Sequence, residues 1–241
     1  MLDADIDFTA YNTMIGMGTT FAGTFDGAGH SIEINIQRNA DYAGLFHNVS
    51  GVIQDLIVYG TVKTSAKFAG GIVSNMLGGQ LIRCQSYTDI ISTVNGDGTH
   101  GGIIGLNSES SDISEVTDCF FGGTINGANT DCCGGVAGWA SSPIMIANTF
   151  MMGNFNISTN GSNVICRNNS LLLQDNCYYY TSWNADVPAG VKKTSPEDYK
   201  NGALCYQLNG SRKDGDMVWY QTLGVDPFPV PDARHKPVYR W

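Results

Sequence analysis

The residues best suited to chemistry lie in two short polar loops, NGDGTH at 95–100 and NGANTD at 126–131. The first loop carries Asp97 and His100, and the second carries Thr130 and Asp131. Oxygen ligands of this kind suit Ca²⁺, and a pair of carboxylates could act as acid and base in glycoside hydrolysis. Asn-Gly sequences also form tight turns in solvated loops. We favour that structural role, because the chain has no GGxGxD calcium repeat.

Four aromatic residues are candidate ligand contacts. Tyr178, Tyr180 and Trp183 lie in CYYYTSW, and Trp139 follows the glycine-rich GGVAG. Alternate residues of a strand share a face, so Tyr178 and Tyr180 point the same way. Exposed aromatic rings can stack on sugars or form protein interfaces. Packing beneath a cap is the interpretation we favour. With Asp97 and Asp131, these four residues make up the predicted ligand-binding set.

No signature of a catalytic, metal or cofactor site accompanies these residues. GxSxG, HExxH, Walker and dinucleotide-binding motifs are absent. The seven cysteines include no CxxC pair, so zinc-ligand spacing is also absent. Asp26 and His30 flank an Asp-Gly turn and are best explained by that turn. We therefore predict no catalytic residues, no bound metal and no cofactor.

The charge balance restricts the partners. The net charge is −9, and only five Lys or Arg residues precede Trp183. Phosphate backbones and anionic membrane surfaces attract basic proteins, so nucleic acid and anionic lipid are not expected partners. No apolar run approaches the roughly 20 residues that a membrane-spanning helix needs. We expect no membrane insertion.

A repeat of about thirty residues must position all of these side chains. Two columns recur when the segments are aligned. The first contains one small or apolar residue per repeat: Leu56, Cys84, Cys119, Thr149 and Cys177. The second contains Gly44-Leu45-Phe46, Gly71-Ile72-Val73, Gly102-Ile103-Ile104 and Gly135-Val136-Ala137. Short β-branched runs separated by glycine favour strands over helices, and strands that recur in this way can stack in parallel as coils of a solenoid.

The cysteines of the first column should remain reduced. In-register neighbours hold their Cβ atoms nearly 5 Å apart, whereas a disulfide needs about 3.8 Å. We expect Cys84, Cys119 and Cys177 to be buried in a ladder. The pairing of Cys132, Cys133, Cys166 and Cys205 is left open.

The segments GTFDGAGHSI, AGLF, GVIQDL, GGIV, GGIIG and GGVAG resemble the Glug-motif repeats of bacterial surface proteins. The resemblance extends over Asp3–Tyr180 and implies a right-handed parallel β-helix, here of about five to six coils. It also implies an extracellular or cell-surface location, with the signal peptide removed. The last coil departs from the motif, because Asn163-Val164-Ile165 and then Cys166 replace the glycine column.

Composition changes near Trp183. Six of the seven prolines and eight of the thirteen Lys and Arg residues follow it. We expect a repeat domain over 1–183 and a capping segment over 184–241 that packs on the last coil, because an open solenoid end exposes unpaired backbone. The tail resembles the segment that often closes Glug arrays. Ser195-Pro196-Glu197-Asp198 predicts the start of one short helix that ends at Gly210.

The function expected from these features is a non-catalytic extracellular module of a bacterial surface or secreted protein. It would act in adhesion, or bind an extended carbohydrate or another surface protein, as a monomeric module of a larger chain. Two alternatives remain open. One is a polysaccharide-active β-helix enzyme, either a lyase or a glycoside hydrolase. The other is a pure structural spacer.

Overall fold

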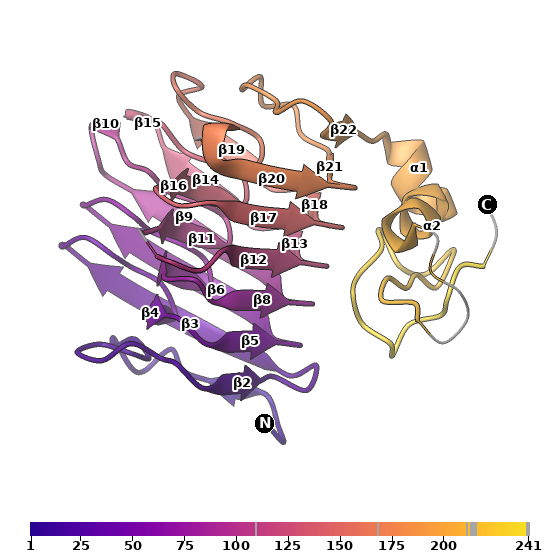
Figure 1. The fold of residues 1–241 in the computed structure, drawn as a ribbon, viewed down its shortest axis with the longest axis horizontal. Coiled ribbons are helices and arrows are strands. Elements are labelled where there is room, and N and C mark those ends of the chain that lie inside the picture. Colours follow the sequence, from indigo (N-terminus) through magenta and orange to yellow (C-terminus); the bar gives the residue numbers. More distant parts are fainter. Residues whose placement is uncertain (109, 168, 211, 213–215, 240–241) are drawn as a thin grey trace.

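The computed structural model describes residues 1–108, 110–167, 169–210, 212 and 216–239. They form a parallel β-solenoid of about six turns, here called coils, with two short helices near the C-terminus (Figure 1). Strands of successive coils pair in parallel and in register throughout the stack, as the repeat predicted. Among the described helices, none is long and apolar enough to cross a membrane.

Three sheets run along the solenoid. The long sheet has ten strands: β1 (Ile6–Asp7), β3 (Ser31–Arg38), β6 (Ile57–Thr64), β9 (Gln85–Ser92), β13 (Phe120–Phe121), β14 (Thr124–Gly127), β18 (Phe150–Met151), β19 (Asn154–Ile157), β21 (Tyr178–Tyr179) and β22 (Lys192–Lys193). The second has six: β2 (Thr24–Asp26), β5 (Val52–Gln54), β8 (Gln80–Ile82), β12 (Ser114–Thr117), β17 (Ile144–Ala147) and β20 (Leu172–Asp175). The third has four: β4 (Phe46–Val49), β7 (Val73–Met76), β11 (Ile104–Asn107) and β16 (Ala137–Ala140). A short pair, β10 (Gly96–Asp97) and β15 (Thr130–Asp131), lies at one edge, and a 3₁₀ turn at Asn169–Leu171 precedes β20.

The two sequence columns line the core. Leu56, Cys84, Cys119, Thr149 and Cys177 are all fully buried. The pairing of Phe46 with Val73, Val73 with Ile104 and Ile104 with Ala137 confirms the second column. The last coil keeps this register, with Asn163 opposite Gly134 and Cys166 opposite Ala137.

Each coil turns a corner through one residue with left-handed backbone. The corner between the second and long sheets uses residues with φ between 47° and 56°: Ala28, Asp55, Arg83, Asp118, Asn148 and Asn176. Side chains at this corner bond to one another along the stack. Arg83 donates to both carboxylate oxygens of Asp55 at 2.6 Å, and Asn176 donates to Asn148 at 3.0 Å. The corner therefore forms a polar ladder.

The outer face of the long sheet carries aromatic rings that need cover. Phe120, Phe150 and Tyr178 are paired in register and buried. They pack against Tyr199, Leu204 and Trp219 of the C-terminal segment. Figure 1 shows this segment beside the coils, not only at the end of the stack. We call residues 216–239 the strap.

The position of the C-terminal segment corrects one expectation. Only its first part packs on the last coil, where β22 pairs with β21. The strap runs back along the side of the solenoid, so that Phe228 stacks on Phe120 at 5.0 Å and Arg234 donates to the carbonyl of Gly29 at 2.8 Å. The aromatic column on the outer sheet face explains this path, because its rings extend along several coils.

The expected single helix is two helices, α1 (Pro196–Asn201) and α2 (Ala203–Asn209). Ser195 caps α1 in a capping box with Asp198, as its sequence predicted. Gly202 then adopts φ 96°, which interrupts the helix. Left-handed backbone is favourable for glycine and cannot continue an α-helix.

A buried carboxylate attaches the C-terminal segment to the corner ladder. Asp118 Oδ1 accepts from Arg212 Nη1 at 2.8 Å and from Trp219 Nε1 at 3.0 Å, and Oδ2 accepts from Arg212 Nη2 at 2.9 Å. The Asp118 side chain is 5% exposed. Removing the Asp118 carboxylate would leave the Arg212 and Trp219 donors buried without hydrogen-bond partners. Buried polar groups without partners destabilise the folded state.

We predict that Asp118→Asn destabilises the protein by roughly 1.5–3 kcal/mol, the range for a hydrogen bond to a charged group. Asparagine tolerates the left-handed backbone, as Asn148 and Asn176 do at the same corner. The measured loss of stability therefore reports the removal of the charge and not a strained backbone. Urea unfolding measures it. Asp112→Asn, at an exposed position, is the matched control and should leave the midpoint unchanged. An unchanged midpoint for Asp118→Asn would mean that the contacts of Asp118 with Arg212 and Trp219 do not stabilise the protein.

We predict that Cys84, Cys119 and Cys177 do not react with thiol reagents in the native protein. All three are fully buried and form no disulfide, and burial raises the pKa of Cys177 to about 12. Since the thiolate is the reactive form, labelling requires unfolding. Thiol titration before and after denaturation tests this, and an intact mass that reveals a bridge between any two of them contradicts the reduced ladder.

Candidate functional site

The structure brings the loop residues of the predicted site together. Pairing of β10 with β15 places Asp97 beside Asp131. His100 and Thr130 are both fully buried. His100 Nδ1 accepts from the Ala69 amide at 3.2 Å, and its Nε2 is 2.9 Å from Ser92 Oγ. Burial lowers the pKa of His100 to about 4. His100 therefore serves the packing of this edge.

Asp97 is held by two cations. Lys67 Nζ donates to Oδ2 at 3.0 Å, while Arg167 Nη1 donates to Oδ1 at 2.8 Å. Arg167 also lies 4.7 Å from the ring centroid of Trp139, which links two of the predicted ligand contacts. Burial would raise the pKa of Asp97, but the hydrogen bonds from Thr99 and Lys67 and the charge of Arg167 lower it. Its oxygens are thus engaged within the protein.

The remaining predicted aromatic residues also pack internally. Tyr178 is 5% exposed and lies beneath the C-terminal segment. Tyr180 meets Tyr199 edge to face at 5.1 Å, and Trp183 stacks on Phe155 at 4.3 Å. These positions match the packing interpretation. Within the described part of the chain, no three His, Cys, Asp or Glu side chains are grouped so as to hold a metal ion.

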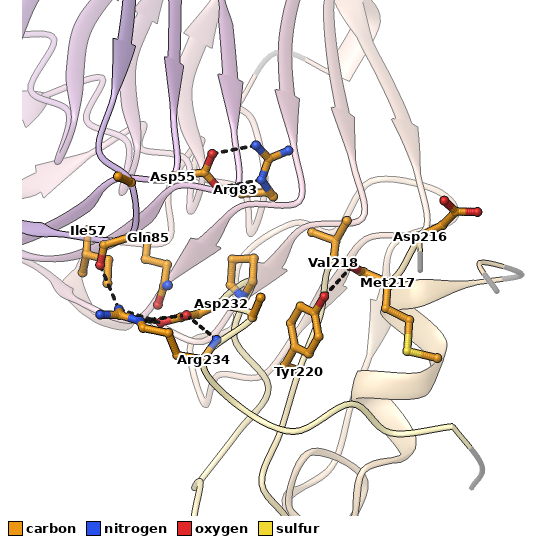
Figure 2. A pocket seen from close by; sticks show the side chains of 14 residues that line it. Asp55, Ile57, Arg83, Gln85, Asp216, Met217, Val218, Tyr220, Asp232 and Arg234 are labelled. Carbon is orange, nitrogen blue, oxygen red and sulfur yellow. Dashed lines mark hydrogen bonds and ion pairs between the residues drawn. The ribbon is translucent and has the colours of Figure 1, made fainter. Parts of the chain in front are cut away.

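A groove between the strap and three successive coils was not found from the sequence. It consists of two clefts, of about 560 Å³ and 260 Å³, which share Ile57, Gln85, Asp232 and Arg234. Figure 2 shows the larger cleft, with the corner ladder on one side and the strap on the other. We call the two clefts together the strap groove.

Two tyrosines form the floor of the smaller cleft. Tyr59 and Tyr87 are in register, and their rings are 5.0 Å apart at an angle of 10°. Parallel rings in contact are only about 3.5 Å apart face to face, so a 5.0 Å centroid distance means that they are offset like roof tiles. Tyr59 is 42% exposed, whereas Tyr87 is half-buried and its ring also lies 5.4 Å from that of Phe120. Burial raises the pKa of both phenols, so each remains a neutral ring with a hydroxyl.

Strap residues form the polar wall. Asp232 accepts from Arg234 Nε and Nη2 at 2.9 Å and 2.7 Å, and Asp226 lies 2.8 Å from His235 Nδ1. Asp226 also accepts from the backbone N–H of Thr222. For both aspartates burial would raise the pKa, but these hydrogen bonds outweigh burial and lower it. The two carboxylates are therefore ionised and fixed in place.

The larger cleft is bounded by ion pairs. The Asp55–Arg83 pair of the corner ladder lies on the coil side, and Asp232 and Arg234 lie on the strap side. Figure 2 shows these two pairs on opposite sides of the cleft, with Tyr220 beyond them. Arg234 crosses to the carbonyl of Gly29 and so joins strap to coil. The cleft thus presents both donors and acceptors, with three carboxylates, those of Asp55, Asp216 and Asp232, against two guanidinium groups.

The repeat alignment contained a signal for the floor. Tyr59 and Tyr87 each follow the first column by three residues, after Leu56 and Cys84, so they had to stack on the outer face. The wall had no such signal. Its residues lie in DPFPVPDARH, in a tail with no repeat to align.

The lowered pKa of Asp97 predicts a pH-dependent contribution to stability. A carboxyl group whose pKa is lowered in the folded state stabilises the protein at any pH above its ordinary pKa of 3.8. This contribution to stability is lost as the pH falls through the folded-state pKa. Asp97→Asn should therefore lower the melting temperature at pH 7. The difference in melting temperature between this variant and the wild type should disappear under strongly acidic conditions. Asp112→Asn is the control, and a gap that stays constant with pH would contradict the ion-pair role.

No family model matches the chain, and no curated protein matches it. It is similar to the crystal structure of a candidate immunoglobulin A1 protease from Bacteroides ovatus, with a TM-score of 0.63 and 17% sequence identity. The match covers 95% of this chain and 84% of that chain. Identity this low supports a shared fold and nothing about activity. The parallel β-solenoid is therefore shared with a solved protein.

Proposed function

We propose that this chain is a non-catalytic extracellular module of a bacterial surface or secreted protein, which binds an extended carbohydrate or protein partner in the strap groove. The observation that carries the proposal is the pair of offset rings of Tyr59 and Tyr87, the first exposed and the second half-buried, beside ordered carboxylates. A solvated aromatic floor beside fixed polar groups is a common arrangement in ligand sites. A role in adhesion follows if the ligand lies on another cell.

Three further features support the proposed surface-binding module. The repeat segments resemble the Glug motifs of bacterial surface proteins, the net charge is −9, and a solenoid offers a long lateral surface. The function as a monomeric module of a larger chain is part of the same proposal. A pure spacer would have the same fold but no need for partly uncovered aromatic rings in a groove, which is why binding is preferred here.

One observation favours the alternative of a polysaccharide-active enzyme. Asp226 and Asp232 line the same cleft, with His235 between them at 2.8 Å and 3.8 Å. Glycoside hydrolysis needs one carboxyl group with a raised pKa as general acid. The pKa of both aspartates is lowered instead, so neither is suited to donate a proton near neutral pH. Binding remains the better explanation of this cluster.

We predict that the purified chain binds at least one structure on a glycan array, and that Tyr59→Ala weakens this binding about fivefold. Loss of one aromatic stacking contact costs about 1 kcal/mol. Tyr206→Ala, an exposed tyrosine on α2, is the matched control and should bind normally. Release of reducing ends or unsaturated products, abolished by Asp226→Asn, would establish the enzyme instead.

A further inference from the structure

We infer that the strap groove takes a neutral, hydroxyl-rich sugar chain in preference to an acidic polysaccharide or a peptide. This inference rests on the proposed binding function and names its ligand class. It depends on four properties of the groove: its charge balance, its fixed hydrogen-bonding groups, its stacked tyrosine rings and the pairing of its floor strands.

The charge balance disfavours an anionic ligand. Four carboxylates line the two clefts, those of Asp55, Asp216, Asp226 and Asp232. The guanidinium groups that line them are those of Arg83 and Arg234, and each is already paired with an aspartate. A uronate or sulfate group would have to displace these partners and would meet like charge, which costs affinity. A ligand without charge avoids both costs.

The hydrogen-bonding groups suit hydroxyls. Ionised carboxylates are acceptors only, and sugar hydroxyls are donors that can also accept. Asp226 is fixed by Thr222 and His235, and Asp232 by Arg234. Groups already held in place lose little entropy when a ligand binds. Gln85, held by the Tyr87 hydroxyl at 2.9 Å, adds an amide to the floor.

The tiled rings match the apolar side of a sugar ring. Tyr59 and Tyr87 belong to successive coils, about 4.8 Å apart along the solenoid axis. Gly29, Asp55 and Arg83 extend the larger cleft over these two coils and the coil before them. A ligand that follows the groove therefore lies along the axis and can meet one coil after another. This geometry favours a chain over a single sugar.

A peptide has less to bind here. Extended peptides usually gain affinity by adding a strand to a free sheet edge. The floor strand β6 pairs with β3 on one side and with β9 on the other. Its backbone groups are already used along the ladder. A peptide would have to rely on side-chain contacts alone.

The test uses the full chain and titration calorimetry with defined probes: cellohexaose, mannohexaose, xylohexaose and maltohexaose as neutral chains, hexagalacturonate as the acidic chain, and an acidic peptide of similar length. We expect at least one neutral chain to bind and the charged probes not to bind. Raising NaCl from about 50 mM to about 500 mM screens charge and should leave the neutral affinity unchanged.

Two variants locate the site. Asp226→Asn should weaken the neutral chain about tenfold, the effect of losing a hydrogen bond to a charged group. Tyr59→Ala should weaken binding of the neutral chain about fivefold. This variant should not disturb the conformation of the strap, because Tyr59 is on the solenoid and 42% exposed. Asp112→Asn and Tyr206→Ala are the controls.

The outcomes separate the two proposals. Tyr59-dependent binding of hexagalacturonate or of the peptide overturns the ligand class and leaves the binding function standing. Neutral-chain binding that neither variant affects moves the site away from the groove and overturns the inference. Failure of every probe to bind overturns the inference, whereas the proposed function falls only if the glycan array shows no binding either.

Discussion

Parallel, in-register stacking of coils is the constraint on which the rest of this structure depends. Each strand pairs with its equivalent in the next coil, so whatever occupies a position must tolerate its own neighbours above and below. At Gly135, in the second column, a Cβ atom would lie 2.0 Å from the carbonyl oxygen of Val164 in the next coil. No side chain fits there, which is why glycine recurs. The left-handed corners follow from the same constraint, because every coil must turn at the same place.

Stacking also creates the need for the strap. A ladder that places Phe120, Phe150 and Tyr178 in register on an outer face produces a large apolar surface. Burial of such rings is strongly favourable, and the C-terminal segment supplies the cover. Its attachment is polar, through Asp118 on the corner and Gly29 farther along. The segment therefore has a structural reason to run along the coils.

The groove is a consequence of that cover being incomplete. Over the first coils Gln85 and Ile57 continue the column of Phe120, while Tyr59 and Tyr87 stack two positions farther along the same strands. The strap above them is irregular and bound by ion pairs. The loop edge at Asp97 shows the opposite arrangement, because its charges are satisfied within the protein by Lys67 and Arg167. The strap groove, by contrast, has room for a ligand between the strap and the coils.

The sequence alone determined the solenoid, its register and the two core columns, because a repeat carries the same local interactions from coil to coil. It also determined the capping box at Ser195. Tyr59 and Tyr87 were fixed in register by the same repeat. Only the tertiary structure decided that Tyr178 is covered and Tyr59 is not. That outcome depends on the path of a tail without repeats, set by contacts between residues about a hundred or more positions apart, such as Asp118 with Trp219 and Gly29 with Arg234. Local patterns carry no information on such pairs, so the strap groove and the break at Gly202 emerged only when the chain was folded.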